Sequence, residues 1–206
     1  MQKIEAENGT NTIKVKAGKL ETTSISAETA TSNNTITLES GNATLELVKA
    51  QNQVVLHAKD AGAKNTITDN ATGDNIITGN MQALDAGENE VTLKKVDMTG
   101  DIFAKNKGKN TITFGEAGRG VSTLTGHVIA DDGTNTLTLN NLNFTGSAQA
   151  LSDGATNTIN LSKGKFNAYL VAISQTADSK NEITLNQVEV TLTAVSYTHL
   201  RAHETS

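Results

Sequence analysis

Asn110-Thr111-Ile112-Thr113-Phe114 is one copy of the five-residue phrase that decides how this chain folds. In each copy an Asn is followed by alternating polar and apolar residues, and the copies begin at Asn11, Asn34, Asn65, Asn89, Asn110, Asn135, Asn157 and Asn181. Successive copies lie 23, 31, 24, 21, 25, 22 and 24 residues apart. A period in this range is typical of stacked-repeat proteins, in which each structural unit packs on the next.

Each repeat predicts three short strands. Side chains alternate between the two faces of a strand, so we expect Ile112 and Phe114 to point inward and Thr111 and Thr113 outward. A turn, a second apolar strand and a third short apolar run then complete the repeat. We therefore predict an all-β fold, a parallel β-helix (β-solenoid) of about eight coils, roughly 40 Å long at about 4.8 Å per coil. An antiparallel β-sandwich is the alternative.

The eight Asn residues occupy equivalent corners of the predicted coils. If they point inward, each side-chain amide can bond to the amide of the next coil, and the corner needs Asn rather than any polar residue. We predict that this ladder is structural. The 31-residue interval after Asn34 predicts an inserted loop around Lys49 to Gln53, which we interpret as a tolerated insertion because it lacks clustered charge or aromatic residues.

Composition narrows the class of protein. Of 206 residues only 3% are aromatic, and Trp, Pro and Cys are absent, so Ile, Val, Leu and Ala must fill a thin interior. A net charge of −5 with dispersed Lys and Arg argues against nucleic-acid binding. No run of apolar residues is long enough for a transmembrane helix. The residues after Met1 lack a signal-peptide core, so the chain is either cytosolic or part of a longer secreted protein.

The last eleven residues depart from the pattern of the repeats. We divide the chain into a repeat region, residues 1–195, and a tail, residues 196–206, which resembles a translated sequencing adapter. His199 and His203 have a spacing that could hold zinc on a helix, but two histidines in foreign composition predict no metal site. Neither end shows a cap, so we expect a fragment whose end coils fray or self-associate.

The repeats resemble those of bacterial autotransporter passengers, including the vacuolating-toxin-like group. The resemblance covers residues 8–193 and rests on the Asn phrase and on units such as Leu142-Asn-Phe-Thr-Gly and Gly133-Thr-Asn-Thr-Leu-Thr-Leu. It implies a right-handed β-helix that is exported through the outer membrane and displayed or shed as an adhesin or toxin stalk. It also implies partners: a host-surface protein or glycan, and the rest of a longer chain that carries the caps and translocator barrel.

The sequence predicts no catalytic, cofactor-binding or metal-binding residues. Asp131 and Asp132 are adjacent and so face opposite ways on a strand or lie solvated in a turn. His57 and His127 each stand without a carboxylate or nucleophile at a recurring offset. Gly118-Arg119-Gly120 reads as a flexible turn rather than a phosphate loop, and residues 69–74 lack the acidic spacing of a calcium loop.

We accordingly predict a non-enzymatic, extracellular protein with a structural or adhesive role. One alternative is a polysaccharide-acting β-helix enzyme, which would gather carboxylates, Lys and Arg in one groove. Another is an ice-binding β-helix, because the outward Thr pairs would form an array that resembles those of such proteins. The pairs are Thr35/Thr37, Thr66/Thr68, Thr111/Thr113 and Thr136/Thr138. Lys14, Glu90, Asn160 and Glu182 interrupt that array in the other four coils.

Overall fold

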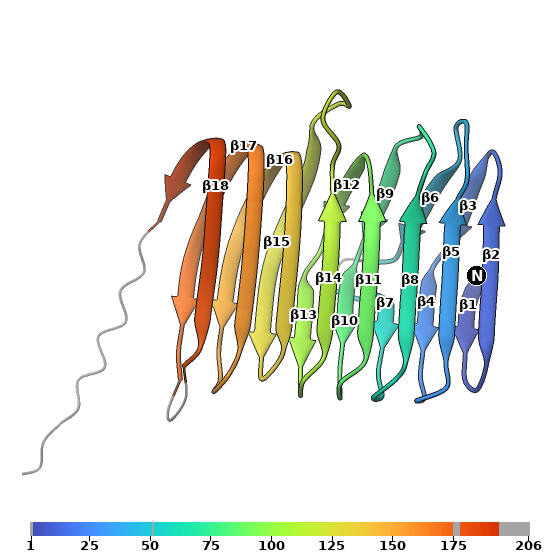
Figure 1. Ribbon diagram of the computed structural model, residues 1–206, viewed down its shortest axis with the longest axis horizontal. Coiled ribbons are helices and arrows are strands. Elements are labelled where there is room, and N and C mark those ends of the chain that lie inside the picture. The colour runs from blue at the N-terminus through green and yellow to red at the C-terminus, as the bar shows by residue number, and fades with distance from the viewer. Residues whose placement is uncertain (1, 51, 175–177, 194–206) are drawn as a thin grey trace, which may run out of the picture.

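The computed structural model describes residues 2–50, 52–174 and 178–193, and these residues form strands and turns without any helix. Every pairing between the named strands is parallel, and each strand away from the two ends pairs with its counterparts one repeat earlier and one repeat later. The coils stack side by side into a rod (Figure 1). The predicted β-solenoid of about eight coils is thereby confirmed. The tail at residues 196–206, with His199 and His203, lies outside the described residues.

The rod has three faces. We number the coils 1 to 8 in the order of their Asn phrases, so coil 1 begins with the phrase at Asn11 and coil 8 with the phrase at Asn181. Face 1 carries the Asn phrases and comprises β2 (Thr10–Val15), β5 (Asn33–Leu38), β8 (Lys64–Asp69), β11 (Glu88–Leu93), β14 (Lys109–Phe114) and the first parts of β16 (Thr134–Ala150), β17 (Thr156–Ala172) and β18 (Lys180–Leu192). Face 2 comprises β3 (Lys19–Thr22), β6 (Thr44–Val48), β9 (Asn75–Thr78), β12 (Val96–Thr99), the start of β15 (Ser122–Asp131) and later parts of β16 to β18.

Face 3 closes each coil. It comprises β1 (Lys3–Ala6), β4 (Ser24–Ala27), β7 (Val54–Ala58), β10 (Asn80–Ala83), β13 (Ile102–Lys105) and the last parts of β15, β16 and β17. In Figure 1 the strands of face 1 lie nearest the viewer and run upward, those of face 3 lie behind and run downward, and the coils advance from right to left. A path of this sense is right-handed.

The coils beyond β14 differ from the predicted three short strands. There β15 runs unbroken through two faces, and β16 and β17 through three. In β16, β17 and β18 one residue with positive φ makes the corner between faces 1 and 2 instead of a loop, whereas β15 starts after the loop of residues 115–121 and continues only from face 2 to face 3. These residues are Asn141, Lys163 and Gln187, with φ of 48°, 64° and 55°. A single left-handed residue bends the chain without ending its pairing.

Inward rows of apolar side chains form one continuous core. Ile112 and Phe114 are at most 1% exposed, as the alternation predicts, and Phe144 and Phe166 stack in neighbouring coils with ring centroids 5.2 Å apart. In β18 the inward residues are less covered: Ile183 and Leu185 are only partly buried. The Ile and Leu positions of the phrase therefore pack fully only where described coils lie on both sides.

The long repeat after Asn34 distributes its extra residues over two corners. Five residues, 49–53, join β6 to β7, whereas only Thr23 joins the equivalent strands of coil 1. Residues 39–43 add a smaller extension, since the matching connection in coil 1 is 16–18. The largest part of the insertion thus lies where the sequence predicts it, although Gln51 itself is outside the described residues.

A column of glycines turns the chain from face 2 to face 3. Gly79, Gly100, Gly126 and Gly146 lie at this corner in successive coils, all with positive φ. A Cβ on Gly126 would lie 2.1 Å from the carbonyl oxygen of Gly100, far inside van der Waals contact. The close stacking of backbone on backbone at this corner therefore requires glycine.

We expect Gly126→Ala to lower the free energy of unfolding by about 1–3 kcal/mol, because the added methyl meets the Gly100 carbonyl and the φ of 149° disfavours an L side chain. Gly120→Ala is the matched control. Its Cβ would meet only the Lys95 side chain at 3.5 Å, so the change should stay within about 0.5 kcal/mol. Urea unfolding followed by circular dichroism measures both, and equal losses would contradict the steric argument.

Candidate functional site

The eight Asn residues of the phrase lie one above another inside the first corner of the rod. From Asn11 to Asn157, each Asn Nδ2 donates to the Oδ1 of the Asn in the next coil, and the seven distances are all 2.8 or 2.9 Å. Six of the eight are at most 1% exposed: Asn34, Asn65, Asn89, Asn110, Asn135 and Asn157. The structure therefore brings all eight residues together in one unbroken hydrogen-bonded column.

The second Nδ2 proton of each Asn ties the column to face 3. Asn110 donates to the carbonyl oxygen of Phe103 at 2.9 Å, and Asn89 donates to that of Gln82 at 2.8 Å. The other six bond to Glu5, Ser26, His57, Ile129, Gln149 and Val171. Only a side chain with two donors and an acceptor on one short planar group can do this, which explains why Asp, Ser or Thr does not replace Asn.

We expect Asn110→Ala to destabilise the protein by about 2–5 kcal/mol, because it removes the acceptor of one Asn89 Nδ2 proton and the side-chain donor to the Asn135 oxygen and the Phe103 carbonyl in the interior. Asn11→Ala removes the same side chain from the first rung, which is only partly buried, and should cost about 1 kcal/mol. Thermal unfolding of the two variants distinguishes an interior ladder from a set of independent bonds, for which the two losses would be equal.

The paired aspartates at positions 131 and 132 do not form an acid–base pair. Asp131 lies 3.0 Å from the Lys105 ammonium in the preceding coil, and that hydrogen bond holds the pKa of its carboxyl below its usual value. Asp132 sits in a turn with φ of 52°, where its carbonyl accepts the Lys107 amide. Both residues therefore bond to the preceding coil where face 3 leads to the next face 1.

The two histidines of the repeat region are not isolated, which corrects the interpretation from sequence. His57 Nδ1 lies 3.5 Å from Glu28 of the previous coil, and His127 Nδ1 lies 2.7 Å from the Ser147 hydroxyl of the next. Ser147 also accepts from the Gln149 amide and is fully buried, so it is not placed to meet a substrate. Sequence spacing missed these partners because they belong to different coils.

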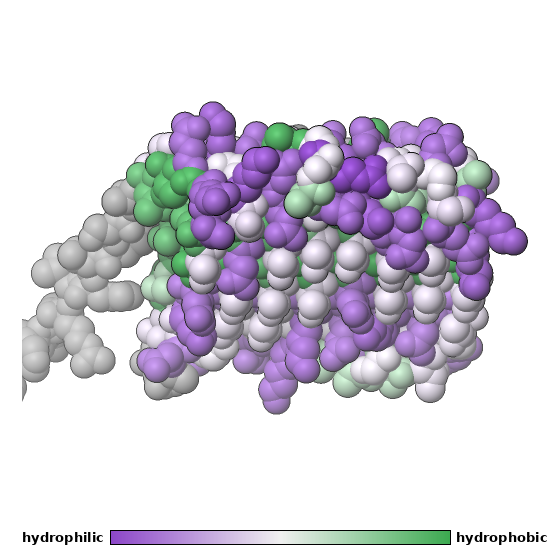
Figure 2. Space-filling view, turned by 45° about the horizontal axis from the view of Figure 1, so that its top comes forward, coloured by the Kyte–Doolittle hydropathy of each residue, from purple (hydrophilic) through white to green (hydrophobic). Residues whose placement is uncertain are grey.

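Outward Thr side chains form two rows along face 1. The strand register aligns Thr37, Thr68, Thr92, Thr113 and Thr138 in five successive coils. The neighbouring row holds Thr12, Thr35 and Thr66, then Glu90, then Thr111, Thr136 and Thr158. Glu90 is paired with Lys64 at 2.8 Å. Figure 2 shows pale side chains in ordered rows across this face.

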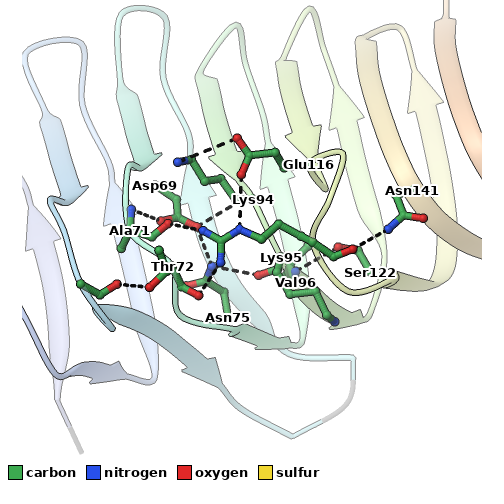
Figure 3. A network of polar contacts seen from close by, with 12 residues as sticks. Asp69, Ala71, Thr72, Asn75, Lys94, Lys95, Val96, Glu116, Ser122 and Asn141 are labelled. Carbon is green, nitrogen blue, oxygen red and sulfur yellow. Dashed lines mark hydrogen bonds and ion pairs between the residues drawn. The ribbon is translucent and has the colours of Figure 1, made fainter.

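A buried polar cluster lies where face 1 turns into face 2 in coils 3 to 5 (Figure 3). Asp69 is 1% exposed and takes the position that Leu38 holds in the preceding coil. Its carboxylate accepts hydrogen bonds from the Ala71 amide at 2.8 Å, from Asn75 Nδ2 at 3.0 Å and from the Lys94 amide at 3.1 Å. These three N–H donors compensate the buried charge.

Asn75 extends the cluster to neighbouring coils. It is fully buried; its Oδ1 accepts from the Leu45 amide at 2.8 Å, and its Nδ2 donates to the Lys95 carbonyl at 2.9 Å as well as to Asp69. Asn75 therefore links coils 2, 3 and 4. The cluster was not predicted from the sequence. The one residue that could have indicated it is Asp69, which replaces the apolar residue that ends the phrase in the other coils.

Above this cluster lies the loop of residues 115–121. The sequence predicts a flexible turn at Gly118-Arg119-Gly120, but the structure fixes Arg119, whose guanidinium donates to the carbonyl oxygens of Ala71 and Thr72. Within the described residues, no group of three or more His, Asp or Glu side chains could hold a metal ion. Nor does that part of the chain contain a helix able to span a membrane.

Comparison with protein-family models, with curated proteins and with solved structures gives no match for this chain.

Proposed function

We propose that this chain is a segment of an exported bacterial surface protein, a non-enzymatic β-solenoid that serves as an adhesin or as a structural stalk. The observation that carries the proposal is the unbroken Asn ladder, because the polar side chain that recurs in all eight coils holds each coil to the next. The resemblance to autotransporter passengers supports a location at the cell surface or outside the cell. A host protein or glycan is the proposed partner of the outer faces.

Several features of the chain fit this role. A rod of parallel coils presents long flat faces, which suits contact with an extended surface better than capture of a small molecule. Ion pairs between coils reinforce the outside; Lys19, for example, hydrogen-bonds to Glu46 and to Glu21, which raises the pKa of its ammonium to about 12. Because the chain has no Cys, it cannot form a disulfide while it crosses an oxidising compartment.

Display of the chain on bacterial cells tests the proposal. Fused between a signal peptide and a translocator barrel and expressed in a Gram-negative bacterium, it should appear outside the cell as a protease-resistant fold. Cells that display it should adhere to a host-cell monolayer or to immobilised glycans several-fold more than cells with the barrel alone. Failure to cross the outer membrane would contradict export, and display without added adherence would contradict the adhesin role and leave the stalk.

Ice binding is a second candidate, and the aligned row of five Thr residues on face 1 favours it. Side chains on this face repeat at about 4.8 Å between coils and about 6.7 Å along a strand, so their hydroxyl and methyl groups form a regular two-dimensional lattice. Glu90 breaks the neighbouring row in coil 4, which shortens the uninterrupted surface. The high strand propensity of Thr also accounts for its presence.

If face 1 binds ice, the protein will lower the freezing point below the melting point, and Thr113→Lys will remove at least half of that gap by placing a charge in the row. Thr125→Lys makes the same change on the exposed side of face 2 and should leave the gap unchanged. Measurement of the freezing and melting points of single ice crystals decides the matter. A wild-type protein without any gap would eliminate this candidate.

A further inference from the structure

The corners between faces 1 and 2 differ sharply in length from coil to coil. Residues 70–74 make this corner in coil 3, only Lys94 and Lys95 make it in coil 4, and residues 115–121 make it in coil 5. A two-residue corner forms no loop. The short corner of coil 4 therefore lies between two longer ones, and the loop of coil 5 can reach across it.

Arg119 makes that reach. Its Nη1 donates to the Thr72 carbonyl at 2.6 Å and its Nη2 to the Ala71 carbonyl at 2.8 Å, in the corner of coil 3 and 47 and 48 residues earlier in the chain. Two bonds from one planar guanidinium fix the direction of the side chain as well as its position. Glu116, on the same loop, lies 3.4 Å from Nε and steadies the other edge of the group.

The rest of the loop is held from coils 4 and 6. Asn141 of coil 6 is almost fully buried and donates through Nδ2 to the Arg119 carbonyl at 2.8 Å. Glu116 also lies 3.9 Å from the Lys94 ammonium, and the buried Ser122 hydroxyl accepts from the Val96 amide at 3.2 Å. Figure 3 shows the contacts of Glu116 and Asn141.

In an ideal solenoid each coil contacts only the coils directly before and after it, so stability is a sum of local and nearest-neighbour contributions. The contact from Arg119 to Ala71 and Thr72 breaks that rule, since it joins coil 5 to coil 3 directly. We infer that residues 115–121 act as a clasp that makes coils 3 to 6 one cooperative unit, while coils outside it open independently. The inference does not depend on what the outer faces bind.

Native-state hydrogen exchange followed by mass spectrometry tests the clasp. The amides of Thr72 and Asn75 are hydrogen-bonded to the Gly41 and Lys95 carbonyls, and in wild type they should exchange through the same opening as coils 4 and 5. In Arg119→Gln we expect both amides to exchange about 5–30-fold faster, which corresponds to a loss of one or two kcal/mol. Lys107→Gln, at an exposed turn between coils 4 and 5, removes the same charge and should change neither amide.

The outcome that overturns the inference is equally specific. If Arg119→Gln speeds exchange only within residues 115–121 and leaves Thr72 and Asn75 unchanged, the loop is a local decoration and not a clasp. Arg119→Lys guards against a variant that fails to fold, because it keeps the charge and loses the two-pronged geometry. We expect it to raise exchange at the same two amides by a smaller factor, and unchanged exchange there would also overturn the inference.

Discussion

The hydrogen bond from each Asn to the next inside the first corner is the constraint on which the rest of the structure depends. Each Asn Nδ2 must meet the Oδ1 of the Asn in the following coil, so the coils can stack in only one register. A slip of one residue would turn every inward side chain outward. Once this register is set, Ile and Leu stack on Ile and Leu, Thr aligns with Thr, and glycine lies on glycine at the corner between faces 2 and 3.

Much of this regular part can be predicted from the sequence, because it repeats. The Asn phrase alone indicates the strand, its inward and outward faces, the corner residue and the approximate number of coils. Prediction fails where the coils differ. Nothing in the periodicity indicates that Arg119 bonds to residues 47 and 48 positions earlier, or that His127 meets Ser147, since such contacts depend on how long each corner is and where it folds. The unbroken strands β16 and β17 were missed for the same reason.

The faces and the corners therefore have different physical roles. On the faces, each side chain meets its equivalent in the next coil, and a change in one coil can be compared directly with its neighbours. At the corner between faces 1 and 2, the chain leaves this order and must satisfy its backbone groups individually. Asp69 illustrates the point: a carboxylate can replace a buried Leu only because the irregular corner supplies N–H groups from residues 71 and 94 and the Asn75 amide.

The Asn ladder also has a direction. In all seven of its bonds the donor belongs to the earlier coil and the acceptor to the later one, so the side-chain dipoles align along the rod instead of cancelling. Aligned hydrogen bonds polarise and strengthen one another. The column of amides is thus an electrically polar filament along one corner of the interior. A coil that adds after Asn181 must offer an oxygen, whereas one that adds before Asn11 must offer an N–H group.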